Sequence, residues 1–387
     1  MEGDIQIMAV RNYSFSLIVL YLSIKYIRPV MGVGIPLILL SSYLLALSFL
    51  SSDPLRSVNF FTVFFVPFMM FPLGFIATKS MTHIQRLYHY SLKTHVLFVL
   101  SILVFSIFRI GNEQYEGGSS LFRSGYFTFS NIYIGSYLLV ISPLVYPTLN
   151  KKIHRGLYVT LCIITMLILL LSMRRTSIAI VVIVGVSYAI ANRRHLAATI
   201  KRTVAVVVVM IAAFPFYQPI LIEQMESRSY LFDKNEGIGD EIQGETRYIE
   251  TIAVWKERIE TKNIEHFLIG NEMFNSIGNY DRGRHGARPL HLDLTVILHG
   301  SGIIGLILYF LVHIQMIRMY FRIKKKLPSN SFNSSKAIFV GIFASIIMLF
   351  FSGSLDAMSF RIVAFLYLGG ILGVFSSEIS KQDRVDS

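Results

Sequence analysis

Long apolar runs alternate with short polar segments along almost the whole of this 387-residue chain. A helix needs roughly 17–25 mostly apolar residues to cross the hydrocarbon core of a bilayer. The pattern predicts about eleven such helices, within a range of 10–12, at residues 12–28, 30–50, 58–77, 94–109, 130–149, 155–172, 176–191, 202–222, 292–320, 336–355 and 359–377. The predicted fold class is an all-α polytopic membrane protein, because a β-barrel would show short segments of alternating polarity.

The composition agrees with this prediction. Hydrophobic residues make up 53% of the chain and charged residues only 15%, whereas a soluble domain has about 25% charged residues. The net charge of +13 does not indicate nucleic-acid binding, because the cations cluster in short loops between spans. The single cysteine, Cys162, lies within an apolar run and excludes an intramolecular disulfide and a thiolate metal site.

Lysine and arginine residues orient the spans, because cytoplasmic loops are enriched in them. Basic loops at 150–155, 193–202 and 322–326 are expected to face the cytoplasm. The alternation of spans then places the loop 110–130, the turn 173–176 and the segment 223–291 on the opposite side. The predicted organisation is an N-terminal transmembrane bundle of about eight helices (1–222), one large extracytoplasmic loop (223–291), three transmembrane helices (292–377) and a cytoplasmic tail (378–387).

The large loop contains one clear helical pattern. In ETRYIETIAVWKERIE the side chains of Tyr248, Ile252, Trp255 and Ile259 form a single apolar stripe, and we expect this helix to lie against the bundle or the membrane interface. Arg247 lies at the start of the helix, off that stripe. The following FLIGNEMFNSIGNYDRGRHGARPLH, rich in Gly and Asn, predicts an ordered loop in which Glu272 bonds the backbone.

Several charged side chains are expected at the outer membrane surface. Arg288, His291 and Asp293 stand where the chain re-enters the membrane. The same side holds four further arginines, Arg123, Arg174, Arg175 and Arg247. Guanidinium groups bind phosphate oxygens bidentately, and a histidine can move a proton near neutral pH. This combination predicts chemistry on a lipid-linked phosphate or diphosphate.

Each of these residues also has a simpler structural interpretation. His291 could bond the backbone at a helix start, and Asp293 could cap that helix. Arg247 could be a solvated surface cation, and Arg123 could mark the membrane interface. The pair Arg174–Arg175 could reflect a miscounted span rather than cations held on the outer side to bind an anion. His299 and His313, within a span, are expected to be packed rather than to bind a metal.

Four patches occur in a fixed order, with a large outer loop and three final spans: RSGYFTFSN (123–131), LSMRRTSIAI (171–180), TRYIETIAVWKE with FLIGNEMFNS (246–276) and RPLHLDLTVILHGSGIIGL (288–306). Together they resemble the motifs of the Wzy-type O-antigen and capsule repeat-unit polymerases and the related O-antigen ligases. The chain departs from the family pattern in two respects. Leu294 replaces an aromatic residue, and the predicted span count is one below the usual twelve.

The resemblance implies a GT-C-like membrane glycosyltransferase in the bacterial inner membrane, with the large loop in the periplasm. Its substrates would be undecaprenyl-diphosphate-linked oligosaccharides, and a chain-length regulator protein would be a partner. No cofactor or metal is expected, because the loops contain no Asp-x-Asp motif. We assign Arg175 and Arg247 to the leaving diphosphate and His291 to the acceptor hydroxyl as general base. Substrate binding is assigned to Arg174, Arg288, Asp293, Arg123 and Tyr248.

Two other functions remain open at this point. An O-antigen ligase, which transfers finished polysaccharide to lipid A–core, would share the arginines and the histidine. The forms GNEMFNS and RPLHLD favour a polymerase. A transporter or flippase would carry charged or broken sites near the membrane midplane in paired halves, whereas the charges here gather at one face.

Overall fold

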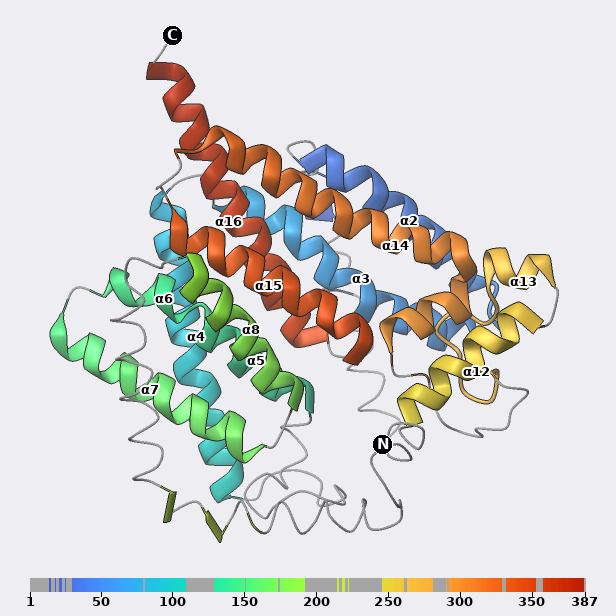
Figure 1. The fold of residues 1–387 in the computed structure, drawn as a ribbon, viewed down its shortest axis with the longest axis horizontal. Coiled ribbons are helices and arrows are strands. Elements are labelled where there is room, and N and C mark those ends of the chain that lie inside the picture. The colour runs from blue at the N-terminus through green and yellow to red at the C-terminus, as the bar shows by residue number, and fades with distance from the viewer. Residues whose placement is uncertain are drawn as a thin grey trace. The chain divides into compact units, whose positions relative to one another are not determined.

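The structure of the protein is a computed structural model (Figure 1). It describes residues 30–78, 81–108, 129–149, 151–172, 175–191, 246–260, 263–280, 292–328, 332–352 and 358–385, together with positions 14, 18, 21, 22, 25, 214, 215, 218, 219, 222 and 290. The helices are α2 (Met31–Phe49), α3 (Pro54–Ala77), α4 (Met81–Ile107), α5 (Phe129–Val140), α6 (Ser142–Val145), the 3-10 helix η3 (Tyr146–Thr148), α7 (Lys152–Leu171), α8 (Arg175–Ala191), α12 (Thr246–Glu260), α13 (Ile264–Ile269), α14 (Asp293–Lys326), α15 (Asn333–Ser352) and α16 (Met358–Val385).

Seven helices of the described part are long and apolar enough to cross a membrane, namely α2, α3, α4, α7, α14, α15 and α16. Helix α8 adds a shorter apolar stretch, Thr176–Ala191. These helices confirm an all-α polytopic membrane protein. The predicted spans 12–28 and 202–222 lie mostly outside the described residues, so the number eleven stays a prediction.

Several helix bounds differ from those predicted. The expected span 130–149 is divided into α5, α6 and η3, because Pro143 and Pro147 carry no backbone N–H and stand where new helical segments start. Helix α4 starts at Met81 rather than at residue 94, and α16 continues to Val385 through most of the expected tail. Hydropathy identifies only the part of a helix that is apolar enough for the hydrocarbon core. A helix can continue beyond that part with polar turns, so its bounds lie outside the predicted span.

The chain divides into two compact units, each described here by itself. The first comprises residues 1–79, 237–329 and 347–387, and the second comprises 80–236 and 330–346. In the first unit α3 and α16 pack backbone to backbone, because a side chain at Gly369 would collide with the carbonyl group of Phe71. In the second unit the His95 ring meets the Thr165 hydroxyl at 2.6 Å and joins α4 to α7.

Helix α14 is two helical pieces rather than one straight span. Gly302 has φ +61°, a left-handed conformation that interrupts the helix. In a straight helix Asp293 and Tyr309 would be about 24 Å apart, since each residue rises 1.5 Å. The Tyr309 hydroxyl nevertheless donates a hydrogen bond of 3.1 Å to the Asp293 carboxylate. The first piece, residues 293–301, is therefore folded back beside the second.

The break in α14 leaves carbonyl groups without helical partners, and neighbouring elements bind them. The His299 carbonyl accepts hydrogen bonds from the Asn271 N–H at 2.8 Å and from Arg258 Nη2 at 2.7 Å. The Ser301 carbonyl accepts from the Tyr43 hydroxyl at 3.1 Å. Helices α12 and α13 lie against α14, as the yellow and orange ribbons in Figure 1 show. The break is thus stabilised by three other segments.

We predict that Gly302→Ala destabilises the protein. The φ of +61° strains any L side chain, and the added Cβ would collide with the Leu268 carbonyl oxygen. The free energy of unfolding should fall by about 1–3 kcal/mol or more, measured as a lower thermal midpoint in detergent. Gly156→Ala is the control, because its Cβ meets nothing within 4 Å and helical Ala is favoured over Gly. Equal midpoints for the two variants would contradict the break.

Candidate functional site

The first residue of α14, Asp293, is held in a buried ion pair. Its side chain is 1% exposed and that of Arg361 is 6% exposed. Arg361 Nη2, from α16, lies 2.6 Å from both carboxylate oxygens of Asp293. With the Tyr309 hydroxyl at 3.1 Å, this carboxylate accepts hydrogen bonds from two helical segments. Paired charges inside a bundle of membrane spans are costly to separate, because each would then stay desolvated and alone.

Aromatic rings surround this ion pair. The Tyr309 ring lies 6.0 Å from that of Phe68 and 5.1 Å from that of Phe350. The His313 ring, one turn after Tyr309, lies 4.8 Å from Phe350 and 6.2 Å from Phe365. Such a lining is apolar, so the attraction between the carboxylate and the guanidinium is screened little. His313 is packed among these rings, as the sequence predicts.

The chain just before Asp293 is fixed to the outer loop. The Leu290 N–H donates a hydrogen bond of 3.0 Å to the Ser276 hydroxyl. Leu290 and Leu292 are both 7% exposed. The position of His291 in the chain thus lies between two buried leucines, although His291 itself lies outside the described residues. Asp293 was expected at the mouth of a span. Because the first piece of α14 folds back, Asp293 instead lies beside Tyr309.

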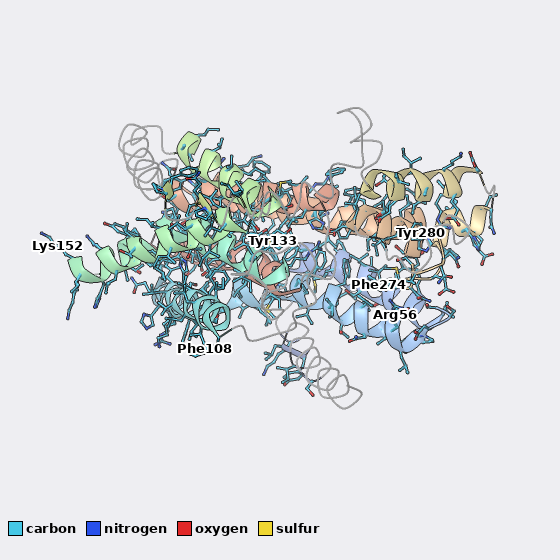
Figure 2. The ribbon with its side chains drawn as sticks, turned by 90° about the horizontal axis from the view of Figure 1, so that it is seen from below. Arg56, Phe108, Tyr133, Lys152, Phe274 and Tyr280 are labelled. Atoms are coloured by element: carbon cyan, nitrogen blue, oxygen red, sulfur yellow. The ribbon has the colours of Figure 1, made fainter. Side chains whose placement is uncertain are left out.

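Glu272 joins the loop 270–280, which carries Phe274 and Tyr280 (Figure 2), to the turn between α2 and α3. Its carboxylate accepts hydrogen bonds from the Ser51 hydroxyl at 2.8 Å, the Ser52 hydroxyl at 2.8 Å and the Ser52 N–H at 3.0 Å. Burial by itself raises the pKa of this carboxyl, but these hydrogen bonds outweigh it and leave the pKa below its ordinary value. Within its own loop the carboxylate accepts a hydrogen bond from the Asn275 side-chain amide at 3.0 Å, not from the backbone as expected. Its other three hydrogen bonds come from the turn between α2 and α3.

Helix α12 forms as predicted, but a different face of it is buried. Ile252 and Trp255 of the expected stripe are 45% and 40% exposed, whereas Glu250, Val254 and Arg258 are 0–3% exposed. Burial lowers the pKa of the Arg258 guanidinium. Besides the His299 carbonyl, Arg258 Nη2 contacts His299 Nδ1 at 3.1 Å. The break in α14 therefore determines which face of α12 turns inward.

Most predicted site residues fall where side chains are not described. Arg175 begins α8, and Arg247 with Tyr248 forms the first turn of α12, but their side chains lie outside the described part. Four others lie wholly outside the described residues, namely Arg123, Arg174, Arg288 and His291. The convergence of the arginines stays a prediction. Asp293 is the one predicted site residue whose side-chain contacts are described here.

Two charged residues of the buried framework escaped the sequence analysis. Arg361 lies inside the predicted span 359–377, and a cation within a span signals a buried partner, so the sequence carried a usable hint. Arg258 sits among charged neighbours of an amphipathic helix and gave no such signal. Its role depends on the break in α14 at Gly302. The sequence does not reveal this break, because Gly302 is one of several glycines in the same stretch.

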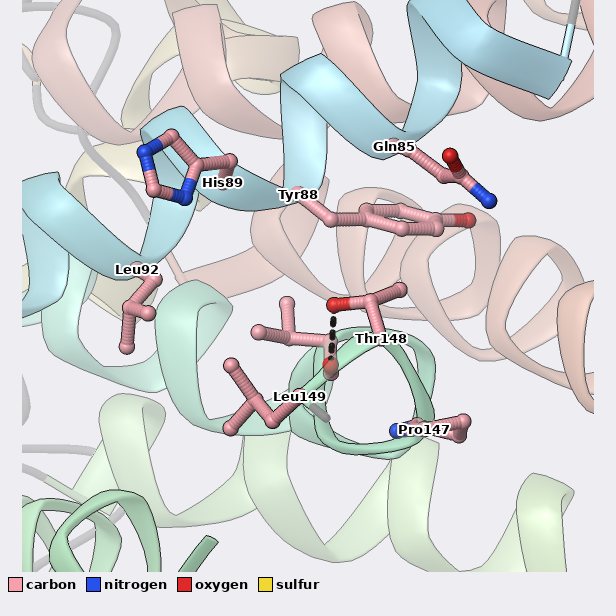
Figure 3. Close-up of a pocket in the computed structure, with 8 residues that line it drawn as sticks. Gln85, Tyr88, His89, Leu92, Pro147, Thr148 and Leu149 are labelled. Carbon is pink, nitrogen blue, oxygen red and sulfur yellow. Dashed lines mark hydrogen bonds between the residues drawn. The ribbon is translucent and has the colours of Figure 1, made fainter. Parts of the chain in front are cut away.

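Two cavities occur among the described residues, one in each unit. A cavity of about 280 Å³ in the second unit (Figure 3) is lined by Gln85, Tyr88 and His89 of α4 and by Thr148 of η3. Another, of about 210 Å³, lies among α2, α3, α14 and α16 of the first unit. Asp293, the predicted site residue whose side chain is described, lines neither cavity. Among the described residues, no cluster of three His, Cys, Asp or Glu could hold a metal ion.

Comparison of the chain with models of protein families finds no match, and a search of curated proteins also finds no match. The family resemblance therefore depends on the motifs and their order alone.

We predict that the Asp293–Arg361 pair is strongly coupled. Asp293→Ala or Arg361→Ala should each cost about 3–5 kcal/mol, because the remaining charge stays buried without its partner. The double variant should cost clearly less than the sum of the two. Thermal midpoints in detergent measure this cycle. Lys381→Ala is the control, because its pair with Glu378 at 2.6 Å is more exposed and should contribute only about 0–1 kcal/mol. Additive effects at 293 and 361 would show that the pair is not coupled.

We predict a pH dependence from Glu272. Because its pKa is lowered in the folded protein, its stabilising contribution is complete above the ordinary value of 4.5 and is lost as pH falls through the lower folded pKa. Glu272→Gln should therefore lower the thermal midpoint at neutral pH, and the difference from wild type should shrink on acidification. Glu260→Gln, at a site with 58% side-chain exposure, is the control. A difference that grows as pH falls would contradict the assigned hydrogen bonds.

Proposed function

We propose that this chain is a GT-C-like membrane glycosyltransferase that polymerises undecaprenyl-diphosphate-linked oligosaccharides into O-antigen or capsular polysaccharide. It would act at the periplasmic face of the bacterial inner membrane, with eleven spans, one large periplasmic loop and a chain-length regulator as partner. The observation that carries this proposal is the sequence Arg288–x–x–His291–x–Asp293, which leads from a large loop into a helix anchored by a buried ion pair. Chemistry on a membrane-borne substrate needs such a fixed position at the edge of the bundle.

The proposed reaction assigns one role to each group. His291 removes the proton from the acceptor sugar hydroxyl, and that oxygen attacks C1 of the sugar on the lipid carrier. The bond between C1 and the diphosphate oxygen breaks, and undecaprenyl diphosphate leaves. Arg175 and Arg247, supported by Arg174 and Arg288, neutralise the charge that develops on the leaving diphosphate. Arg123 and Tyr248 contact the glycan or the lipid phosphate.

The contacts of Asp293 change the role that we assign to it. Its carboxylate oxygens are engaged by Arg361 and Tyr309, so we assign it to positioning the chain rather than to binding sugar. One residue, Leu292, separates it from His291, and Leu290 on the other side of His291 is bonded to Ser276. Anchors on both sides of the general base would restrict its motion toward the acceptor hydroxyl.

The test is a gel of surface polysaccharide from a deletion strain complemented with variants. We expect the deletion to collapse the ladder to single-repeat material and the wild type to restore it. Arg247→Ala should fail to restore it, because losing one group that stabilises transition-state charge costs about 10²–10³ in rate. Lys256→Ala is the matched control, a cation on the same helix with 66% side-chain exposure, 3.8 Å from Glu260.

Other results would redirect the assignment. Full-length polymer that remains on its lipid carrier in the deletion strain would indicate a ligase. An unchanged ladder in the deletion strain would exclude a polymerase and favour a transporter. Restoration of the ladder by Arg247→Ala at normal protein levels would remove that arginine from the site.

A further inference from the structure

The cavity of about 210 Å³ in the first unit lies at one end of the helical bundle. Val30 stands at the start of α2, Phe75 near the end of α3, and Ser376 in the second half of α16. The remaining wall comes from the last turns of α14, including Gln315 and Arg322. This is the end of α14 that runs into Lys324–Lys326, a basic segment expected at the cytoplasmic surface.

Arg322 lines this cavity, and its side chain is exposed. Its guanidinium makes no hydrogen bond or ion pair with the residues that the structure describes. On the neighbouring α16, Glu378 is engaged by Lys381 at 2.6 Å. Three further lysines follow within four residues, Lys324, Lys325 and Lys326. This end of α14 therefore carries a surplus of positive charge that an anion would balance.

We propose that this cavity binds one anionic phospholipid from the cytoplasmic leaflet. The Arg322 guanidinium would bind the phosphate, and the amide of Gln315 and the hydroxyl of Ser376 would bind polar groups of the head. Phe75 and Met319 supply an apolar wall along which an acyl chain can lie. Basic pockets between spans on this side of a membrane suit such headgroups, and the leaflet itself is anionic. The inference does not depend on the proposed polymerase activity.

The other described cavity provides a contrast. The residues that line it are Gln85, Tyr88, His89, Leu92, Val145, Pro147, Thr148 and Leu149 (Figure 3). Polar groups are present there, but no lysine or arginine of the described part lines it. An anionic headgroup gains most where a guanidinium can pair with its phosphate, which favours the cavity at Arg322.

Two residues allow the cavity to be tested by charge and by space independently. Gly32 lies in its wall near the start of α2, and a Cβ added there meets nothing within 4 Å. Gly32→Leu should occupy part of the hollow without a change in charge, and it replaces glycine by a better helix former. Arg318, one turn before Arg322 on α14, is exposed and does not line the cavity. Arg318→Ala therefore removes the same charge from the same helix.

The experiment is native mass spectrometry of the purified full-length protein, delipidated in detergent and titrated with phosphatidylglycerol or phosphatidylcholine. Wild type and Arg318→Ala should retain one phosphatidylglycerol and prefer it to phosphatidylcholine. Arg322→Ala should bind it about fivefold more weakly, the loss expected for one cation at a membrane surface. Gly32→Leu should show a loss at least as large.

Equal losses for Arg318→Ala and Arg322→Ala would overturn the proposal, because general attraction to the basic surface would then explain the binding. Undiminished binding by Gly32→Leu would place the lipid elsewhere. If Gly32→Leu fails to fold, the comparison of the two arginine variants decides alone. Equal binding of both lipids would remove the anionic preference, and displacement by inorganic phosphate would assign the site to a free anion.

Discussion

The ion pair between Asp293 and Arg361 is the constraint on which the rest of the first unit depends. A carboxylate and a guanidinium inside a bundle of membrane spans stabilise the fold only while they stay together. At 2.6 Å, the pair joins the first residue of α14 to α16, and the Tyr309 hydroxyl binds the same carboxylate. Both contacts are possible only because α14 reverses its course at Gly302.

That reversal in turn requires the outer elements. Breaking a helix inside a bundle frees carbonyl groups that water does not reach, so other donors must bind them. Arg258 of α12, Asn271 after α13 and Tyr43 of α2 meet this need at the His299 and Ser301 carbonyls. The loop that supplies Asn271 is itself held by Glu272 to the turn before α3. The loop, the break and the ion pair thus form one connected framework.

The sequence predicted much of the fold because hydrophobic length is a local property. Helices α2, α7 and α8 begin and end close to their predicted bounds, and the amphipathic α12 was located correctly. The site was less predictable because its framework is nonlocal. The stripe with Ile252 and Trp255 is an apolar face of α12, yet Glu250 and Arg258 are buried instead. The hydrogen bonds that Arg258 makes at the break stabilise this orientation more than burial of the apolar stripe would. Asp293 looked like a residue at a span's mouth because no local pattern reveals that residues 293–301 fold back.

The framework anchors the chain at Leu290 and at Asp293, on both sides of residue 291, where the proposed function places its general base. The most direct test of this account is a cross-link between positions 293 and 361. In a Cys162→Ala background, Asp293→Cys with Arg361→Cys removes both charges together and leaves neither one unpaired. A short bifunctional thiol reagent should join the two cysteines, so that fragments cut at a protease site inserted between α14 and α15 stay together on a gel. Fragments that separate as they do in the single-cysteine controls would contradict the folded-back helix and the ion pair that depends on it.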